Sequence, residues 1–279
     1  MIYAIGDIQG CFYTFLKLLA GLPDYEEIWL AGDILNRGPE SLKMLRWAYK
    51  NQKHCKIVLG NHDIHAIAVL NGIRTVGKLD TLYDLQNAPD RYKLIDFLRE
   101  QPFVQTKNKV SMIHAGLFPL WDINTAISFS NELQKNLQSS NWVSFLQDVF
   151  GNEPKIWHED LLPRDKLRFA MNTFTRMRYC SKEGEINFNQ KNYPPDETLD
   201  IAFRPWFEWH NQKAIKNLKH DKKDIQTILF GHWSDVGLVN SAYAIGLDTG
   251  CVWKRKLTAI RIDSENPEDR EFYQQSYIG

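Results

Sequence analysis

The first 72 residues alternate short apolar runs with segments of helical periodicity, and this alternation restricts the fold more than any other feature of the sequence. Three apolar runs have the length of buried strands: Ile2–Ile5, Ile28–Ala31 and Lys56–Leu59. Each precedes a segment with apolar residues at helical spacing: Cys11–Ala20, a helix near Glu40–Lys50 opened by Pro39, and one near Ile64–Leu70. Repeated strand–helix units predict an α/β fold with a mostly parallel sheet, and right-handed crossovers place all three strand ends at one edge.

Glycine and a polar side chain follow each of these runs. In residues 4–12, Ala-Ile-Gly-Asp-Ile-Gln-Gly-Cys-Phe, the apolar run stops at Gly6-Asp7 and a second glycine follows at position 10. The other two runs end in Gly32-Asp33 with Asn36-Arg37-Gly38, and in Gly60-Asn61-His62-Asp63. Two later apolar runs end in the same way, in His114-Ala115-Gly116 and in Gly231-His232. One Gly-Asp pair is usually a turn, and one histidine is usually a partly buried core residue. Five together favour a site, because open α/β sheets build their sites at this edge and glycine permits close approach of the backbone to a ligand.

The rest of the chain predicts a single domain, residues 1–279, with an insertion. Residues 78–101 have a polar helical pattern, and Val110–His114 is a predicted strand. Residues 117–225 are rich in Trp, Asn, Gln and charge, and we expect a largely helical lid there. Apolar runs at 225–230, 243–247 and 257–262 predict a second sheet packed on the first. The last dozen residues are charged, and we expect them to be mobile.

Composition limits the partners of the chain. The 279 residues include 34 acidic and 34 basic side chains, and this balance argues against a nucleic-acid or membrane-surface partner. No basic and apolar leader precedes the first strand, and no apolar run approaches the roughly 18 residues of a membrane span. The four cysteines are scattered, as is typical of reduced cytosolic thiols. We therefore expect a cytoplasmic protein that is a monomer or a weak dimer.

The polar side chains at the strand ends are metal ligands by type. Carboxylates, amide oxygens and imidazoles suit Mn, Fe, Co or Zn and show no thiolate preference. Two cations about 3.5–4 Å apart can generate hydroxide at neutral pH and clamp a phosphoryl group for in-line displacement. One carboxylate must then bridge the two ions, and Asp33 is the natural candidate because it lies between the other ligands in sequence.

These blocks resemble the calcineurin-like metallophosphoesterases, in the phosphoprotein-phosphatase branch, whose pattern is G-D-x-H-G, G-D-x-x-D-R-G, G-N-H-E, H-[GA]-G and a later His. Within that branch, GDIQGC, RGPESL, LGNHD, HAG, TFTRMRYC, FGHW and LDTGCVW resemble the bacterial symmetrical bis(5'-nucleosyl)-tetraphosphatases. The resemblance covers Ile2 to about Ile262. It implies a four-layer α/β/β/α sandwich with a helical lid, and cleavage of diadenosine tetraphosphate into two ADP by a metal-bridging hydroxide.

The resemblance also implies roles for individual residues. The first metal would be held by Asp7, Gln9 and Asp33, and the second by Asp33, Asn61, His114 and His232. His62 would be the general acid, and Arg37 would contact substrate phosphate. The further substrate-binding candidates are Asn61, Arg176, Arg178 and Trp233, with stacking surfaces also among Arg204, Pro205, Trp206 and Phe207. Taken individually, Trp206 and Phe207 are better interpreted as lid core.

Several neighbouring residues have a supporting role or none in this interpretation. We expect Asp63 to support the site or to cap the helix that follows, and Asp248 to position a ligating histidine. Nothing requires a thiol nucleophile at Cys11 or Cys251. Five histidines lie outside the strand-end pattern and are expected at the surface or in supporting positions: His54, His65, His158, His210 and His220.

Two positions depart from the family pattern. Gln9 replaces the usual His, and because an amide oxygen is a weaker donor than imidazole, the first site should favour Mn or Mg over Zn. Across both sites we expect Mn or Co first, with Mg, Fe or Zn as further choices. Asn36 replaces the Asp that partners the catalytic His in protein phosphatases. Two alternatives remain, a serine/threonine phosphoprotein phosphatase and a catalytically silent nucleotide-binding sensor.

Overall fold

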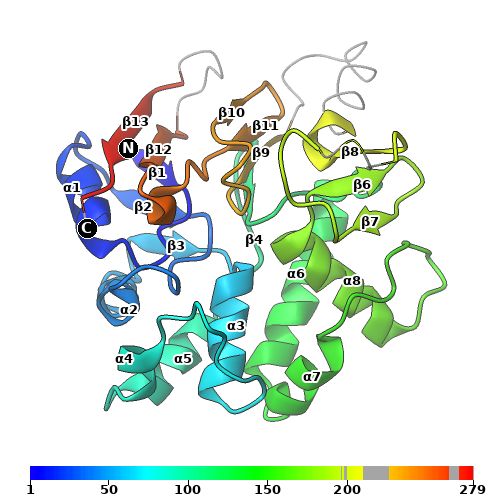
Figure 1. Ribbon diagram of the computed structural model, residues 1–279, viewed down its shortest axis with the longest axis horizontal. Coiled ribbons are helices and arrows are strands. Elements are labelled where there is room, and N and C mark those ends of the chain that lie inside the picture. Colours follow the sequence, from blue (N-terminus) through cyan, green and yellow to red (C-terminus); the bar gives the residue numbers. More distant parts are fainter. Residues whose placement is uncertain (196, 198–199, 210–225, 264–269, 279) are drawn as a thin grey trace.

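The computed structural model describes residues 1–195, 197, 200–209, 226–263 and 270–278. Two five-stranded sheets lie face to face, and helices cover their outer sides (Figure 1). The strand order is β13-β12-β1-β2-β3 in the first sheet and β10-β11-β9-β5-β4 in the second. This is the α/β sandwich that the sequence predicted.

The parallel half of the first sheet forms as predicted. β1 (Ile2–Ile5), β2 (Glu27–Leu30) and β3 (Cys55–Ile57) are parallel neighbours, with Ile5 opposite Leu30 and Leu30 opposite Ile57. The helices α1 (Phe12–Ala20), α2 (Ser41–Lys50) and α3 (Asn61–Leu70) follow these strands. All three strand ends therefore meet at one edge of the sheet.

Two predictions about the C-terminal region were wrong. The run 257–262 forms β12 (Lys256–Arg261), which pairs antiparallel with β1 and so belongs to the first sheet rather than the second. The chain end is not a mobile tail throughout, because β13 (Phe272–Ser276) pairs with β12 at the sheet edge. An edge strand exposes one side to water, so its polar composition resembled that of a tail.

The second sheet supplies the other half of the sandwich. β9 (Thr227–Phe230) lies between two parallel neighbours, β5 (Val110–Ile113) and β11 (Ala244–Gly246), and β4 (Val104–Lys107) and β10 (Val239–Asn240) complete the sheet. The strand at 104–107 was not predicted. Side chains from both sheets form one buried layer between them: Ile2, Ala4, Trp29, Met112, Leu229 and Ile245.

The remaining helices lie below and beside the sheets (Figure 1). α4 (Tyr83–Gln86) and α5 (Arg91–Arg99) follow α3. Segment 117–225 contains α6 (Ile123–Gln138), α7 (Trp142–Val149) and α8 (Pro163–Arg176). A small sheet of β6 (Tyr179–Ser181), β7 (Ile186–Asn187) and β8 (Phe203–Pro205) follows α8, so the described part of the segment is not helical throughout. Residues 210–225, with His210 and His220, lie outside the described residues. Within the described parts of the chain, the helices are too short or too polar to cross a bilayer.

Candidate active site

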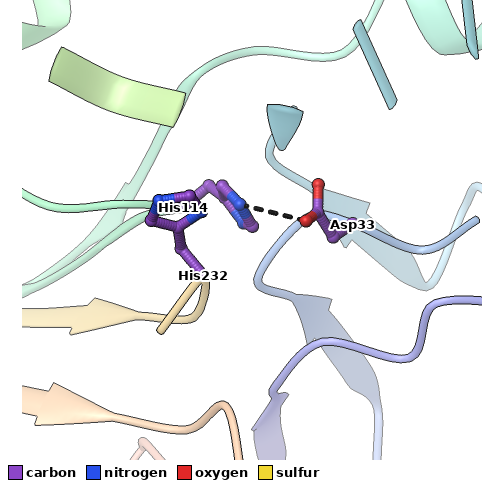
Figure 2. A group of neighbouring side chains, drawn as sticks. All are labelled: Asp33, His114 and His232. Atoms are coloured by element: carbon purple, nitrogen blue, oxygen red, sulfur yellow. Dashed lines mark ion pairs between the residues drawn. The ribbon is translucent and has the colours of Figure 1, made fainter. Parts of the chain in front are cut away.

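Loops from both sheets meet where the strands end. Asp33 follows β2, His114 follows β5 and His232 follows β9, and their ligand atoms lie within 4.8 Å of one another. Figure 2 shows Asp33 facing His114, with His232 beside the His114 ring. Asp33 Oδ2 lies 3.4 Å from His114 Nε2, and Asn61 Oδ1 lies 3.3 Å from the same nitrogen. The structure therefore brings together four of the predicted metal ligands.

Asp7 joins this group through the backbone of the His232 loop. Both of its carboxylate oxygens accept from the His232 N–H at 3.1 Å. Gly231 makes this contact sterically feasible, because a Cβ at that position would overlap Asp7 Oδ1. Gln9 N–H donates to the Asp33 carbonyl oxygen at 2.8 Å, and its side chain is buried. Both halves of the predicted ligand set thus lie in one buried region.

Backbone strain is concentrated in these loops. Seven residues other than glycine have a positive φ within the described part of the chain, and five of them are Gln9, Asp33, Asn36, Arg37 and His232. Such conformations cost about 1–3 kcal/mol each and persist where the surrounding structure imposes them. Their clustering in the loops that meet between the two sheets is typical of a functional site.

Supporting hydrogen bonds orient the ligands. His114 Nδ1 lies 2.7 Å from the Ala31 carbonyl oxygen, which can only accept, so Nδ1 carries the proton and Nε2 faces Asp33. Asp33 Oδ1 accepts from the His62 N–H at 2.7 Å. Asp63 accepts from the backbone N–H groups of Gly60 and Asp33 at 2.9 and 2.8 Å. Asp63 thus caps α3 and also ties the β2 loop to it, which confirms both expected roles.

The buried acidic groups of the site favour a bound cation. Burial raises the pKa of Asp7 well above its usual value, and Asp248 and Asp33 raise it further. Burial, followed by the charge of Asp33, raises the pKa of Asp63 to about 7, and burial raises that of Asp248 to about 6. These acids resist ionisation because they are crowded together away from water. Divalent ions between them would supply the missing positive charge, so the donor set and its electrostatics fit a metal centre.

A second polar network adjoins the centre through His62. Asn36 Nδ2 lies 3.1 Å from His62 Nδ1 and donates to Asp80 Oδ1 at 2.9 Å. The same carboxylate binds Arg37 Nη1 at 3.3 Å and His65 Nε2 at 2.7 Å. Burial alone would raise the pKa of Asp80, but hydrogen bonds from Asn36 and His65 lower it to about 2. Asp80 was missed because it lies in a polar stretch without a motif, 44 residues from Asn36.

A cavity of about 580 Å³ opens beside this network. Its lining includes Arg37, Asn61 and His62 from the loops that hold the metal ligands, and Arg176 from the end of α8. Arg74, which the sequence did not single out, also lines the cavity. The structure therefore places the predicted acid and three of the predicted substrate contacts around one space.

Comparisons with known proteins agree with this geometry. Residues 1–234 match the sequence profile of the calcineurin-like phosphoesterases. The chain belongs to this family. A protein of Burkholderia thailandensis named bis(5'-nucleosyl)-tetraphosphatase, symmetrical, is 38% identical over 97% of this chain and 93% of its own length. The phosphoesterase fold is shared by a crystal structure provisionally assigned as a diadenosine tetraphosphatase, with TM-score 0.58, 19% identity and coverage of 98% of this chain and 93% of that one.

A cold-active protein-tyrosine phosphatase from a psychrophilic Shewanella species has a TM-score of 0.53 and 18% identity, covering 98% of this chain and 80% of its own. At such low identity, structural similarity supports the phosphoesterase fold and leaves the substrate open. The family match agrees with a divalent-metal site among the strand-end residues, since Asp33, His114 and His232 of this phosphoesterase could hold a metal ion.

Two of the predicted substrate contacts lie elsewhere. Arg178 Nη2 donates to the His232 carbonyl oxygen at 3.1 Å, so this phosphoesterase uses Arg178 to hold a ligand-bearing loop. Trp233 is 2% exposed, donates from Nε1 to the Lys191 carbonyl oxygen and packs edge-on against Tyr179 and Tyr193. Their contacts with substrate stay predictions. Trp206 and Phe207 are buried, which confirms their interpretation as core residues.

Other expected supporting residues have simpler positions. Asp248 Oδ1 accepts from the Gly250 N–H at 3.1 Å, so its expected partnership with a ligating histidine stays a prediction. His65 has the supporting contact with Asp80 described above. Cys11 and Cys251 are buried free thiols.

Proposed function

We propose that this phosphoesterase is a symmetrical bis(5'-nucleosyl)-tetraphosphatase that hydrolyses diadenosine tetraphosphate into two ADP. The observation that carries the proposal is the 38% identity to a protein of that name, over nearly the whole length of both chains. The cavity supports it, because arginines surround a space large enough for part of a nucleotide, next to the metal ligands.

The metal ligands divide between two positions in this proposal. Asp7, Gln9 and Asp33 hold the first ion, and Asp33, Asn61, His114 and His232 hold the second. Bound divalent ions supply Lewis-acid polarisation of the phosphoryl group and lower the pKa of the attacking water. Mn²⁺ or Co²⁺ suits the oxygen and nitrogen donors best, with Mg²⁺, Fe²⁺ or Zn²⁺ as further choices.

The protein's own groups orient the substrate and stabilise the leaving group. The Arg37 guanidinium lines the cavity with one edge held by Asp80, and we assign it to a substrate phosphate. The side-chain Nδ2 of Asn36 donates to His62 Nδ1, which fixes the tautomer with the proton on Nε2. That N–H can then donate a hydrogen bond to the leaving oxygen. Burial lowers the pKa of His62, so near pH 7 the ring is neutral and stabilises the leaving oxyanion through this hydrogen bond, without transferring the proton.

An anhydride suits this arrangement better than a phosphoprotein. A serine or threonine alkoxide leaves poorly and needs a well-supported acid. The leaving group of an anhydride is a phosphate oxyanion, whose protonated form has a pKa of only about 6. A hydrogen-bond donor partnered by the neutral amide of Asn36, rather than an acid partnered by a carboxylate, is sufficient for such a group.

The proposal is tested by supplying the metal-stripped protein with Mn²⁺, Co²⁺, Mg²⁺ or Zn²⁺ in turn and offering two substrates in parallel, diadenosine tetraphosphate and a phosphoserine peptide. We expect turnover of the dinucleotide to exceed that of the peptide by orders of magnitude. The reverse preference would identify a phosphoprotein phosphatase. Dinucleotide binding without turnover in any metal would identify a nucleotide sensor.

A further inference from the structure

We propose that the cavity beside His62 is the binding site of the leaving ADP, with its phosphates held by Arg74 and Arg176 and its adenosine against the apolar wall of Ile73, Phe150 and Met171. This inference rests on the proposed function and deepens it, because it assigns one half of the substrate to one place.

The cavity lies between two separate parts of the chain. Arg37, Asn61 and His62 come from the strand-end loops and the start of α3, and Arg74 lies in the turn after α3, whereas Phe150 and Arg176 come from the ends of α7 and α8. In Figure 1, α3 lies to the left of α7 and α8. The volume of about 580 Å³ falls within the roughly 300–1,000 Å³ of small-molecule sites. His62 is assigned to the leaving oxygen, so a ligand in this cavity lies on the leaving side.

The lining of the cavity carries positive charge and lacks acids. Three arginines line it, and neither Asp nor Glu is among the lining residues in the described part of the chain. Arg37 is paired with Asp80 behind the cavity wall. Within the described residues, the Arg74 guanidinium has neither a hydrogen bond nor an ion pair, and it lies 4.9 Å from the centre of the Phe150 ring. One half of a phosphate clamp is therefore available.

Arg176 supplies the other half. Its Nη1 donates to Asn172 Oδ1 at 2.8 Å, and its guanidinium lies 4.8 Å from the centre of the Phe188 ring, so neither contact neutralises its charge. Burial lowers the pKa of Arg176, and the nearby charge of Arg74 lowers it further. Two guanidiniums that repel each other without a carboxylate between them favour an anion that both can bind.

The chemistry of the walls selects a nucleoside diphosphate. A bare polyphosphate would use the arginines and leave the apolar wall in contact with water. A nucleoside diphosphate uses both, because its phosphates meet the guanidiniums and its flat base covers Ile73, Phe150 and Met171. Of the two ADP units in the substrate, the one on the His62 side therefore fits this cavity.

The test is equilibrium binding of ADP to the full-length protein in the presence of Mn²⁺, measured by calorimetry. We expect Arg74→Met and Arg176→Met each to weaken ADP binding about ten-fold, the loss of one charge-assisted contact. Arg164→Met is the matched control, because Arg164 lies on the same helix as Arg176 and its side chain is 58% exposed. It should bind ADP like the wild type.

Two further probes separate the outcomes. Inorganic phosphate, which reports on the metal centre, should bind all variants equally, and pyrophosphate should bind the wild type about ten-fold more weakly than ADP. Unchanged ADP binding in both arginine variants would overturn the proposal, as would equal affinity for ADP and pyrophosphate or a parallel loss of phosphate binding. If ADP binds as expected but the wild type does not hydrolyse the dinucleotide, the proposed function fails and this site stands.

Discussion

Asn36 is buried at the junction between the metal centre and the network around Asp80, and all of its hydrogen-bonding groups have partners. Its Nδ2 donates to His62 Nδ1 and to Asp80 Oδ1. Its Oδ1 accepts from the backbone N–H groups of Arg37 and Thr81 at 2.8 and 3.0 Å. An Asp at this position would set two carboxylates against each other. The departure from the family pattern is therefore matched by Asp80, which the sequence did not single out.

This pairing predicts a compensated substitution. Asn36→Asp should lower the free energy of unfolding by about 1–3 kcal/mol and reduce turnover, since it removes a donor and crowds two carboxylates. Adding Asp80→Asn should restore most of both, because the new amide can donate to the new carboxylate. Urea denaturation of the four proteins in the double-mutant cycle measures the coupling. Simple additivity of the two changes would show that the 2.9 Å contact carries no energy.

Gln9 is the other departure, and we assign it to the first metal. Gln9→His should shift metal preference toward Zn²⁺, because imidazole is a stronger donor to zinc than an amide oxygen. A change of about 1.4 kcal/mol in the difference between the zinc and manganese binding free energies would alter the ratio of the two affinities ten-fold. Histidine tolerates the positive φ of 44° at this position better than most residues. Metal titrations of both proteins measure the ratio, and an unchanged ratio would place the Gln9 side chain outside the coordination sphere.

At the scale of the elements, the loops after the strands hold the ligands because glycines let the loops approach each other. Gly231→Ala should strongly reduce metal binding and activity, since its Cβ would push Asp7 away from the His232 loop. Gly21→Ala is the control, because its nearest new neighbour is the Leu18 carbonyl oxygen at an ordinary 3.5 Å. Metal content after dialysis and thermal unfolding of both variants measure the effect. Full metal content in the Gly231 variant would contradict this steric account.

The elements that could be predicted from the sequence are those with a strong apolar pattern. β1, β2 and β3, each buried, stand out as apolar runs, and so do the polar residues that follow them. The edge strand β13 could not be recognised because one of its sides faces water, and the placement of β12 depends on pairing with β1 across the length of the chain. Asp80 and Arg74 were missed for the same reason, because their roles arise from contacts distant in sequence.

At the scale of the whole molecule, the two sheets bring together buried Asp and His side chains whose ionisation destabilises the folded state when no metal is bound. Near pH 6.5, the ordinary pKa of histidine, His62 and His232 are already neutral in the folded protein because burial lowers their pKa values. Above that pH, the groups with raised pKa values dominate. Asp7 and Asp63 are raised by burial, and His114 is raised because Asp33 outweighs its burial. Asp63, with a pKa of about 7, keeps a proton near pH 6.5 that the unfolded state has released, and the raised pKa values of Asp7 and His114 act in the same direction.

The free energy of unfolding of the metal-stripped protein should therefore fall as pH rises from about 6.5 to 8. A group with a raised pKa in the folded state loses its stabilising contribution as pH rises through that pKa. One such proton corresponds to about 1.4 kcal/mol per pH unit, or about 2–4 °C in Tm. With Mn²⁺ present the trend should vanish or reverse, because ligand deprotonation then favours binding. Differential scanning calorimetry of both forms measures this. The same dependence of Tm on pH with and without Mn²⁺ would contradict the assignment of these buried acids to a metal centre.

The central claim is symmetrical cleavage of the tetraphosphate at this centre. The most direct measurement is hydrolysis of diadenosine tetraphosphate in ¹⁸O-labelled water with Mn²⁺, followed by chromatography and mass spectrometry of the products. The account predicts ADP as the sole nucleotide product, with one ¹⁸O in half of the molecules, on the terminal phosphate. ATP and AMP in equal amounts would contradict it, because the attacked phosphate would then lie one position away from the one that the cavity assigns.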